Sequence, residues 1–266
     1  MKVLIIGCGN MGFTYAESFL KSHILTKDDF LILQRSKDRR NFLLNQGFNH
    51  VHAEAGSFIS EGDIVIIAVK PQDWPSLAST IKPFVEEDQL FISIMAGIEL
   101  SSIQSDLGVK KVIRAMPNLP SQIGVGMTTY TSADEVTRGE LMFAQNMLGS
   151  TGQAMYLKEE RMIDASTAVS GSGPAYIFYF MKAMIEGAID LGFTQSEAEQ
   201  LVKQTFRGSV QLQNRSEISM QEWMDKVASK GGTTEAALNS FGIKVEGEIK
   251  AGVKAAFNRA IELSKR

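Results

Sequence analysis

Three glycines near the amino terminus have the spacing of a phosphate-binding loop. Gly7, Gly9 and Gly12 form a G-x-G-x-x-G pattern in "GCGNMG", directly after the apolar run "KVLIIG". The first glycine permits a tight turn, the second lets the backbone approach a pyrophosphate, and the third lets a helix pack on the strand. The phosphates accept hydrogen bonds from free N–H groups at the helix N-terminus. The pattern therefore favours a dinucleotide site over a merely structural glycine turn.

The end of the second apolar run bears on which dinucleotide binds. In "LILQRSKDRR", Gln34 stands where an enzyme that prefers NAD usually has an acidic residue to hold the ribose 2′-hydroxyl. Arg35 and Ser36 follow, and both are suited to a 2′-phosphate. A solvated, basic helix start would account well for Arg39 and Arg40, but less easily for Arg35. The sequence thus favours NADPH over NADH.

A second candidate site lies far along the chain, in "SKGGTTEAALNSF" (229–241). Gly231 and Gly232 have no side chain to block approach, so the backbone N–H groups that lead into the next helix can point at a carboxylate. Thr233 or Thr234 can cap that helix and leave the other hydroxyl for a ligand. From spacing alone, a plain loop followed by an N-cap fits equally well.

Other polar residues give weaker signals. His23, His50 and His52 have no cysteine or carboxylate partners at metal-ligand spacing, so we expect no metal site. Lys70, in "AVKPQ" after a buried apolar run, fits a general acid, a cofactor contact or a structural loop residue. This segment and "SIMAGI" both follow apolar runs, at the strand ends where doubly wound sheets bind ligands.

The two halves of the chain differ in pattern. The runs at 2–7, 30–34, 63–69, 90–96 and 111–117 read as strands buried on both faces, with helical segments between several of them. Such a pattern predicts an α/β fold with a doubly wound, Rossmann-type sheet. Stretches near 125–131 and 153–157 fit edge strands. After about residue 160 only helices are expected, so we predict domains at 1–158 and 159–266.

The helix expected near residues 170–192 is apolar on almost every side. Its polar residues form one narrow stripe, made of Tyr179, Lys182, Glu186 and Asp190. A helix of this kind must be covered almost all round. About a hundred residues make a thin shell, so a second copy of the chain is favoured over packing against the chain's own first domain.

Composition sets limits on function. The 266 residues are 44% hydrophobic and 21% charged, as in a protein with a real core, and the net charge is −3. This charge argues against non-specific nucleic-acid binding. The single cysteine, Cys8, excludes an internal disulfide and suits a reducing compartment. No apolar stretch reaches membrane-spanning length. We expect a cytoplasmic protein with no nucleic-acid or membrane partner.

Together these segments resemble the pyrroline-5-carboxylate reductases, which reduce a cyclic imine acid to proline. The match covers essentially the whole chain and depends most on "MPN" (116–118), "SGSGPAY" (170–176) and "GGTT" (231–234). The resemblance implies an N-terminal Rossmann domain, a C-terminal helical dimerisation domain, and a homodimer or a higher oligomer built from dimers. It also implies pyrroline-5-carboxylate as the substrate and NADPH as the cofactor, with NADH possible but weaker.

The family's site residues carry over to matching positions. The resemblance implies a cofactor site made of Gly7, Cys8, Gly9, Asn10, Met11, Gly12, Arg35, Ser36, Ala68, Val69, Lys70, Pro71, Ala96 and Gly97. It implies a substrate site made of Asn118, Ser229, Gly231, Gly232, Thr233 and Thr234. Asn118 would lie near the nicotinamide. Thr234, against the imine nitrogen, would be the catalytic residue.

Several positions depart from the family pattern. Leu119 stands where threonine is common, Lys230 where proline is commoner and Met95 where a small residue is usual. An asparagine that often contacts the adenosine side has no clear match near Ala55. None of these departures removes a group that the chemistry demands, but they leave the cofactor preference and the substrate open.

The absence of a histidine near 229–241 agrees with this chemistry. A cyclic imine can take a proton from solvent before hydride arrives, so no strong general acid is needed. Alignment of donor and acceptor can supply roughly 7–11 kcal/mol, whereas a general acid typically supplies a factor of about 10²–10⁴. We therefore expect hydride transfer by alignment.

Two rival interpretations remain. Hydroxyacid dehydrogenases of the same plan carry a catalytic lysine in G-x-G-x-x-x-K, but here Gly171 and Gly173 would put Ile177 in its place. A related imine reductase is a further alternative of this kind. A reductase-like NADPH-binding regulator without turnover is suggested by Leu119 and Met95, although the retained "SKGGTT" argues against it.

Overall fold

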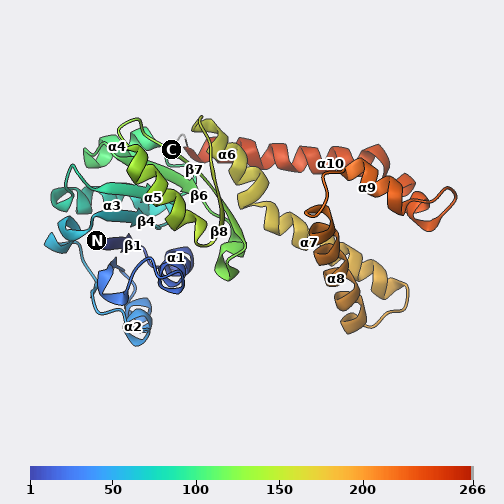
Figure 1. Ribbon diagram of the computed structural model, residues 1–266, viewed down its shortest axis with the longest axis horizontal. Coiled ribbons are helices and arrows are strands. Elements are labelled where there is room, and N and C mark those ends of the chain that lie inside the picture. Colours follow the sequence, from blue (N-terminus) through green and yellow to red (C-terminus); the bar gives the residue numbers. More distant parts are fainter. Residues whose placement is uncertain (265–266) are drawn as a thin grey trace. The chain divides into compact units, whose positions relative to one another are not determined.

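The computed structural model describes residues 1–264, which form two compact units (Figure 1). The first unit contains Met1–Ser172 together with residues 256–264, and the second contains Gly173–Ala255. This division falls later than the predicted boundary after residue 158. Within residues 1–264, no helix is long and apolar enough to cross a membrane.

The first unit is built on one eight-stranded sheet. Its strands are β1 (Val3–Ile6), β2 (Phe30–Leu33), β3 (Val51–His52), β4 (Ile64–Ile67), β5 (Leu90–Ser93), β6 (Val112–Met116), β7 (Gly126–Ser132) and β8 (Gly152–Tyr156), in the order β3-β2-β1-β4-β5-β6-β7-β8. Strands β1 to β6 pair in parallel, β7 is antiparallel to β6, and β8 is parallel to β7. The predicted Rossmann-type fold is confirmed.

Helices cover both faces of this sheet, and the pattern of burial explains why. The helices of the unit are α1 (Asn10–Lys21), α2 (Lys37–Asn45), α3 (Trp74–Ile81), α4 (Leu100–Leu107), α5 (Arg138–Gly149) and α6 (Arg161–Ser166). Alternate residues of β1 point to opposite faces: Val3 and Ile5 pack with α1 and α5, while Leu4 and Ile6 pack with α3 and α4. Central strands buried on both faces need the continuous apolar runs seen in the sequence.

Two strands differ from the sequence-based expectation. The segment near 125–131 forms β7, which lies between β6 and β8 and is therefore not an edge strand; β8 is the edge. Strand β3 was not predicted, because only Val51 and His52 pair with β2, and two residues carry no periodic signal.

A buried ion pair joins β6 to α6. Arg114 of β6 is only 1% exposed; its guanidinium donates to Asp164 Oδ1 at 2.5 Å and to Glu160 Oε1 at 3.0 Å. Glu160 Oε1 also accepts the backbone N–H of Leu100, at the start of α4, at 2.8 Å. This cluster ties the strand that leads into Pro117 and Asn118 to two helices.

The second unit is helical, as predicted. It contains α7 (Gly173–Asp190), α8 (Gln195–Gln213), α9 (Met220–Val227) and most of α10 (Thr233–Ser264). Thr194 with Glu197, and Ser219 with Glu222, form capping boxes that start α8 and α9. Gly192, with φ of 103°, follows the end of α7, where a glycine of positive φ commonly ends a helix.

The apolar sides of α7 are not covered by the described residues 1–264 of one chain. No residue of this helix is fully buried. Phe178 is 58% exposed and Tyr179 is 70% exposed, and Leu191, just beyond the end of the helix, is 83% exposed. Lys182 and Glu186 of the polar stripe form an ion pair at 2.6 Å. Large exposed apolar surfaces of this kind usually mark an interaction site.

Candidate functional site

The glycine loop connects β1 to α1 in a tight turn. Gly7 has a φ of 88°, and its N–H donates to the carbonyl of Leu33 at 2.9 Å, which joins the loop to the end of β2. The N–H of Gly9 donates to the carbonyl of Gly7 at 2.8 Å and closes the turn. Helix α1 then begins at Asn10 with no side chain capping it. Its first N–H groups have no partner within the helix and are suited to an anion.

Side chains at the three loop positions would meet different surroundings. A Cβ on Gly7 would lie 2.6 Å from Val69 Cγ1, and a Cβ on Gly12 would lie 2.7 Å from the carbonyl oxygen of Gly7. A Cβ on Gly9 would meet no atom within 4 Å. The first and third glycines are therefore required by packing, whereas Gly9 faces open space. This geometry fits a loop whose second glycine admits a dinucleotide's diphosphate.

Cys8 contributes its backbone to this loop, not a reactive thiol. The side chain is buried. Burial raises the pKa of the Cys8 thiol to about 12, against a smaller lowering by the nearby charge of Arg39. The thiol is therefore protonated at neutral pH.

The end of β2 presents the arginine expected to hold a 2′-phosphate. The side chain of Arg35 is 88% exposed, and its Nη2 lies 3.8 Å from Asp73 Oδ1. Ser36 is the N-cap of α2, where its Oγ accepts the N–H of Arg39 at 3.4 Å. Arg40 Nη1 donates to the carbonyls of Gln34 and Arg35, at 3.0 and 2.5 Å, and fixes the backbone that carries Arg35.

The carboxyl ends of β4 and β5 lie on the same side of the sheet as the glycine loop. Ala68 N–H donates to the carbonyl of Ile6 at 2.8 Å, which places "AVKP" beside the glycine loop. Ala68, Val69 and Pro71 are half-buried, whereas Lys70 is exposed. After β5, Met95 is 2% exposed and belongs to the apolar cluster that includes Trp74 and Leu100. Met95 therefore fills the core, which explains this departure from the family pattern.

Gly97 lies beneath the last turn of α10. Its φ is 72°, and a Cβ there would lie 3.1 Å from the carbonyl carbon of Leu263 and 3.2 Å from the backbone nitrogen of Ser264. Both the backbone conformation and the contact require glycine. Ala96, just before it, is half-buried.

Asn118 links three segments of the first unit. Its Nδ2 donates to the carbonyl and hydroxyl oxygens of Ser170, both at 3.2 Å, and its Oδ1 accepts the N–H of Met127 at 2.9 Å. Ser170 belongs to a π-helical turn, Thr167–Gly171, and such turns occur frequently at functional sites. The amide of Asn118 therefore positions "SGSG" against the end of β6, and its contact with a nicotinamide stays a prediction.

The second predicted site, residues 229–234, belongs to the second unit. Helix α10 begins at Thr233, so both threonines lie in its first turn and neither is its N-cap, contrary to the expectation. Thr234 is half-buried and Thr233 exposed. The N–H of Gly231 donates to Glu235 Oε2 at 2.6 Å, and that of Gly232 donates to the carbonyl of Ser229 at 2.9 Å. Both glycine N–H groups thus already have acceptors.

The acceptor at Gly231 is the carboxylate of Glu235, in the first turn of the same helix. This back-bond takes up one of the N–H groups that the sequence assigned to a ligand's carboxylate. Sequence reasoning did not identify Glu235, although a glutamate in the first helical turn is a known signal for such a back-bond.

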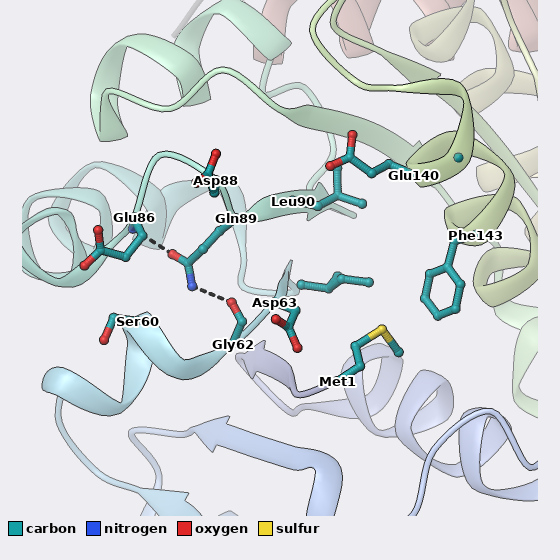
Figure 2. A pocket seen from close by; sticks show the side chains of 12 residues that line it. Met1, Ser60, Gly62, Asp63, Glu86, Asp88, Gln89, Leu90, Glu140 and Phe143 are labelled. Atoms are coloured by element: carbon teal, nitrogen blue, oxygen red, sulfur yellow. Dashed lines mark hydrogen bonds between the residues drawn. The ribbon is translucent and has the colours of Figure 1, made fainter.

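A pocket lies near the amino-terminal ends of strands β4 and β5, at the opposite end of these strands from the glycine loop (Figure 2). It is lined at the starts of β4 and β5 by Ile64 and Leu90 and by the side chains of Asp63, Glu86, Asp88 and Glu140, among others. Gln89 beside them is bonded to Glu86 N and to the carbonyl of Gly62. No predicted site residue is among those lining the pocket. Its carboxylates would repel a phosphate group, so we do not assign it to a dinucleotide.

The described residues 1–264 contain no group of three or more histidine, cysteine, aspartate or glutamate side chains placed to hold a metal. The candidate site residues fall into two separate sets, one in each unit. One is the glycine loop with the strand ends beside it. The other is the hydroxyls and N–H groups at the start of α10.

The fold, the open glycine loop and the helical second unit define a Rossmann-type dinucleotide-binding protein. Residues 160–263 match the pyrroline-5-carboxylate reductase dimerisation family, and residues 2–97 match a family described as NADP oxidoreductase, coenzyme F420-dependent. The chain belongs to the pyrroline-5-carboxylate reductase family.

Individual relatives support this assignment over the full length. A pyrroline-5-carboxylate reductase of Pseudomonas aeruginosa is 33% identical, with 100% of this chain and 97% of that protein covered. The solved structure of a pyrroline-5-carboxylate reductase from Coxiella burnetii is 30% identical, with a TM-score of 0.90 and coverage of 100% and 99%. That of the Plasmodium falciparum pyrroline carboxylate reductase, with NADP bound, is 26% identical, with a TM-score of 0.89 and coverage of 99% and 98%.

Proposed function

We propose that this protein reduces 1-pyrroline-5-carboxylate to L-proline with NADPH as the hydride donor, the last step of proline biosynthesis. The observation that carries the proposal is the full-length identity of 33% to a pyrroline-5-carboxylate reductase. The open space at Gly9 adds physical support for the cofactor site. NADH is a weaker alternative donor.

The glycine loop and the strand ends beside it would hold the cofactor. The first N–H groups of α1 would bind the diphosphate, and Arg35, with Ser36, would bind the 2′-phosphate. The structure of the Plasmodium falciparum relative contains NADP. When bound, the nicotinamide supplies the hydride, and the chain's own part is to orient it.

The start of α10 would hold the substrate. The first N–H groups of α10, which have no acceptor within the helix, would be the donors for the substrate's carboxylate. The hydroxyl of Thr234 would hydrogen-bond the ring nitrogen and orient the C=N bond. The proton on that nitrogen comes from solvent, since an imine of this kind is protonated before the hydride arrives. Alignment, and not a strong general acid, is then the main contribution of these residues.

The second unit would also form the dimer. Residues 160–263 match a dimerisation family, and the apolar sides of α7 have no cover among residues 1–264 of one chain. We propose a homodimer in which these sides are buried, or a larger assembly built from such dimers. Sedimentation of the purified protein at several concentrations tests this, and a monomer at micromolar concentration would contradict it.

The activity is tested directly by incubating the purified protein with pyrroline-5-carboxylate and NADPH. We expect oxidation of the cofactor, followed by its absorbance, and formation of proline in equal amount, followed by chromatography. Cofactor binding without oxidation above background would favour the regulator interpretation instead.

Replacing Arg35 by alanine should weaken NADPH much more than NADH. Only NADPH carries the 2′-phosphate, and a hydrogen bond to a charged group contributes about 1.5–3 kcal/mol, or roughly tenfold or more in affinity. The ratio of kcat/KM for the two cofactors measures the effect. The Asp73→Asn change should act in the opposite direction, since it removes a carboxylate that lies 3.8 Å from the guanidinium. An unchanged ratio in Arg35→Ala would remove Arg35 from the phosphate site.

A further inference from the structure

Arg39, on the first turn of α2, makes two hydrogen bonds to the glycine loop. Its Nε donates to the carbonyl of Cys8 at 2.8 Å, and its Nη2 donates to the carbonyl of Gly9 at 3.0 Å. The two segments are about thirty residues apart in the chain, and this guanidinium joins α2 to the loop. We propose that Arg39 is a positioning residue that holds the glycine loop ready for the cofactor's diphosphate, an inference that rests on the proposed function.

The contact with Gly9 fixes the orientation of one peptide group. In a trans peptide the C=O and the next N–H point in opposite directions. Arg39 binds the carbonyl of Gly9, so it holds the N–H of Asn10 pointing away from the guanidinium. The same carbonyl also accepts the N–H of Phe13 at 3.0 Å, within α1. The first N–H group of α1, which is a donor for a phosphate, is thereby set before the ligand arrives.

The guanidinium itself is held in place by two aromatic rings. Its central carbon lies 4.9 Å from the ring centre of Phe13 and 4.5 Å from that of Phe42. The two rings meet edge to face, with centres 5.1 Å apart. Arg39 is half-buried, unlike the exposed Arg35. A planar guanidinium can donate from two nitrogens at once while it packs against aromatic rings, and a lysine does not reproduce this.

The two arginines therefore have different expected roles. Arg35 faces solvent at the end of β2, where a 2′-phosphate distinguishes NADPH from NADH. Arg39 acts on the loop that receives the diphosphate, which both cofactors share. Replacing Arg39 should therefore weaken the binding of NADPH and NADH equally, whereas replacing Arg35 should weaken the binding of NADPH much more than that of NADH.

The test compares Arg39→Lys and Arg39→Gln in the full-length protein. Dissociation constants are measured by calorimetry for NADPH, NADH, ADP-ribose and 2′-AMP. We expect both variants to bind NADPH, NADH and ADP-ribose about tenfold more weakly, since hydrogen bonds of a charged donor are lost. Binding of 2′-AMP, which has no diphosphate, should be unchanged. Lys37→Gln, at an exposed position on the same helix, is the matched control and should bind like the wild type.

Each other outcome has a distinct meaning. Wild-type affinity in Arg39→Lys would show that charge alone matters and would overturn the positioning role. A loss confined to NADPH and 2′-AMP would place Arg39 in the 2′-phosphate site and also overturn it. Thermal unfolding without cofactor shows whether the variants fold. If neither variant folds, Phe42→Leu, which removes one supporting ring, should weaken the binding of NADPH and NADH equally. Wild-type affinity for both cofactors in Phe42→Leu would overturn the inference. A wild-type protein that binds neither cofactor would refute the proposed function itself.

Discussion

Replacing Thr234 by alanine is expected to lower kcat by roughly 10²-fold and to leave the affinity for NADPH nearly unchanged. Loss of one preorganised hydrogen-bonding group in a reaction site, such as one donor of an oxyanion hole, commonly costs a factor of about 10²–10³. The Thr234 hydroxyl would be such a group, because it would accept the N–H of the protonated imine. Thr234 is half-buried in the first turn of α10, in a different unit from the glycine loop. Steady-state kinetics with pyrroline-5-carboxylate, together with a binding titration of NADPH, separates the two effects.

The Thr234→Ser variant is the matched control, because it keeps the hydroxyl and removes only a methyl group. It should recover most of the turnover. An equal loss of turnover and of NADPH affinity in Thr234→Ala would assign residues 229–234 to the cofactor instead of the substrate. Full activity in Thr234→Ala would remove the hydroxyl from the mechanism.

Replacing Asp164 by alanine is expected to cost about 3–5 kcal/mol of the free energy of unfolding, because it leaves the charge of Arg114 buried without its closest partner. Arg114 is 1% exposed, and Glu160, its other partner, is itself partly exposed. Urea unfolding at one fixed protomer concentration measures the change, since the stability of the proposed dimer would depend on concentration.

The Glu199→Ala variant provides the comparison. Glu199 pairs with Lys203 at 2.6 Å on α8, but both side chains are exposed, and exposed pairs contribute little. The expected result is therefore a large shift of the urea midpoint for Asp164→Ala and almost none for Glu199→Ala. Equal small shifts would mean that water or a rearranged Glu160 compensates Arg114.

The central fold could be predicted because its residues repeat a simple pattern. The strands near Ile5, Ile32, Ile66 and Ile92 are continuous apolar runs, and such runs are what a sheet covered on both faces requires. The glycine loop could also be predicted, because its three glycines lie at a fixed spacing within a short stretch of chain. Strand β3 was missed for the opposite reason: its two residues are too few to form a pattern.

The polar contacts of the site were less readable. Arg39 looked like part of a solvated helix start, yet it binds carbonyls about thirty residues away, and no local pattern encodes such a contact. The proximity of Asp73 to Arg35 depends in the same way on how two strand ends meet. Glu235 could have been found, since it lies within four residues of its partner, Gly231.

The coverage of Gly97 by Leu263 and Ser264 has a consequence for how the chain can be divided. The second unit leaves the first after Ser172, and α10 returns to it at residue 256, so the helical unit is an insertion anchored at both ends. A stop codon after Ser172 would therefore not release an intact Rossmann domain, because it would strip the loop after β5 of its cover. An isolated nucleotide-binding module would need the final helical segment spliced directly back onto it.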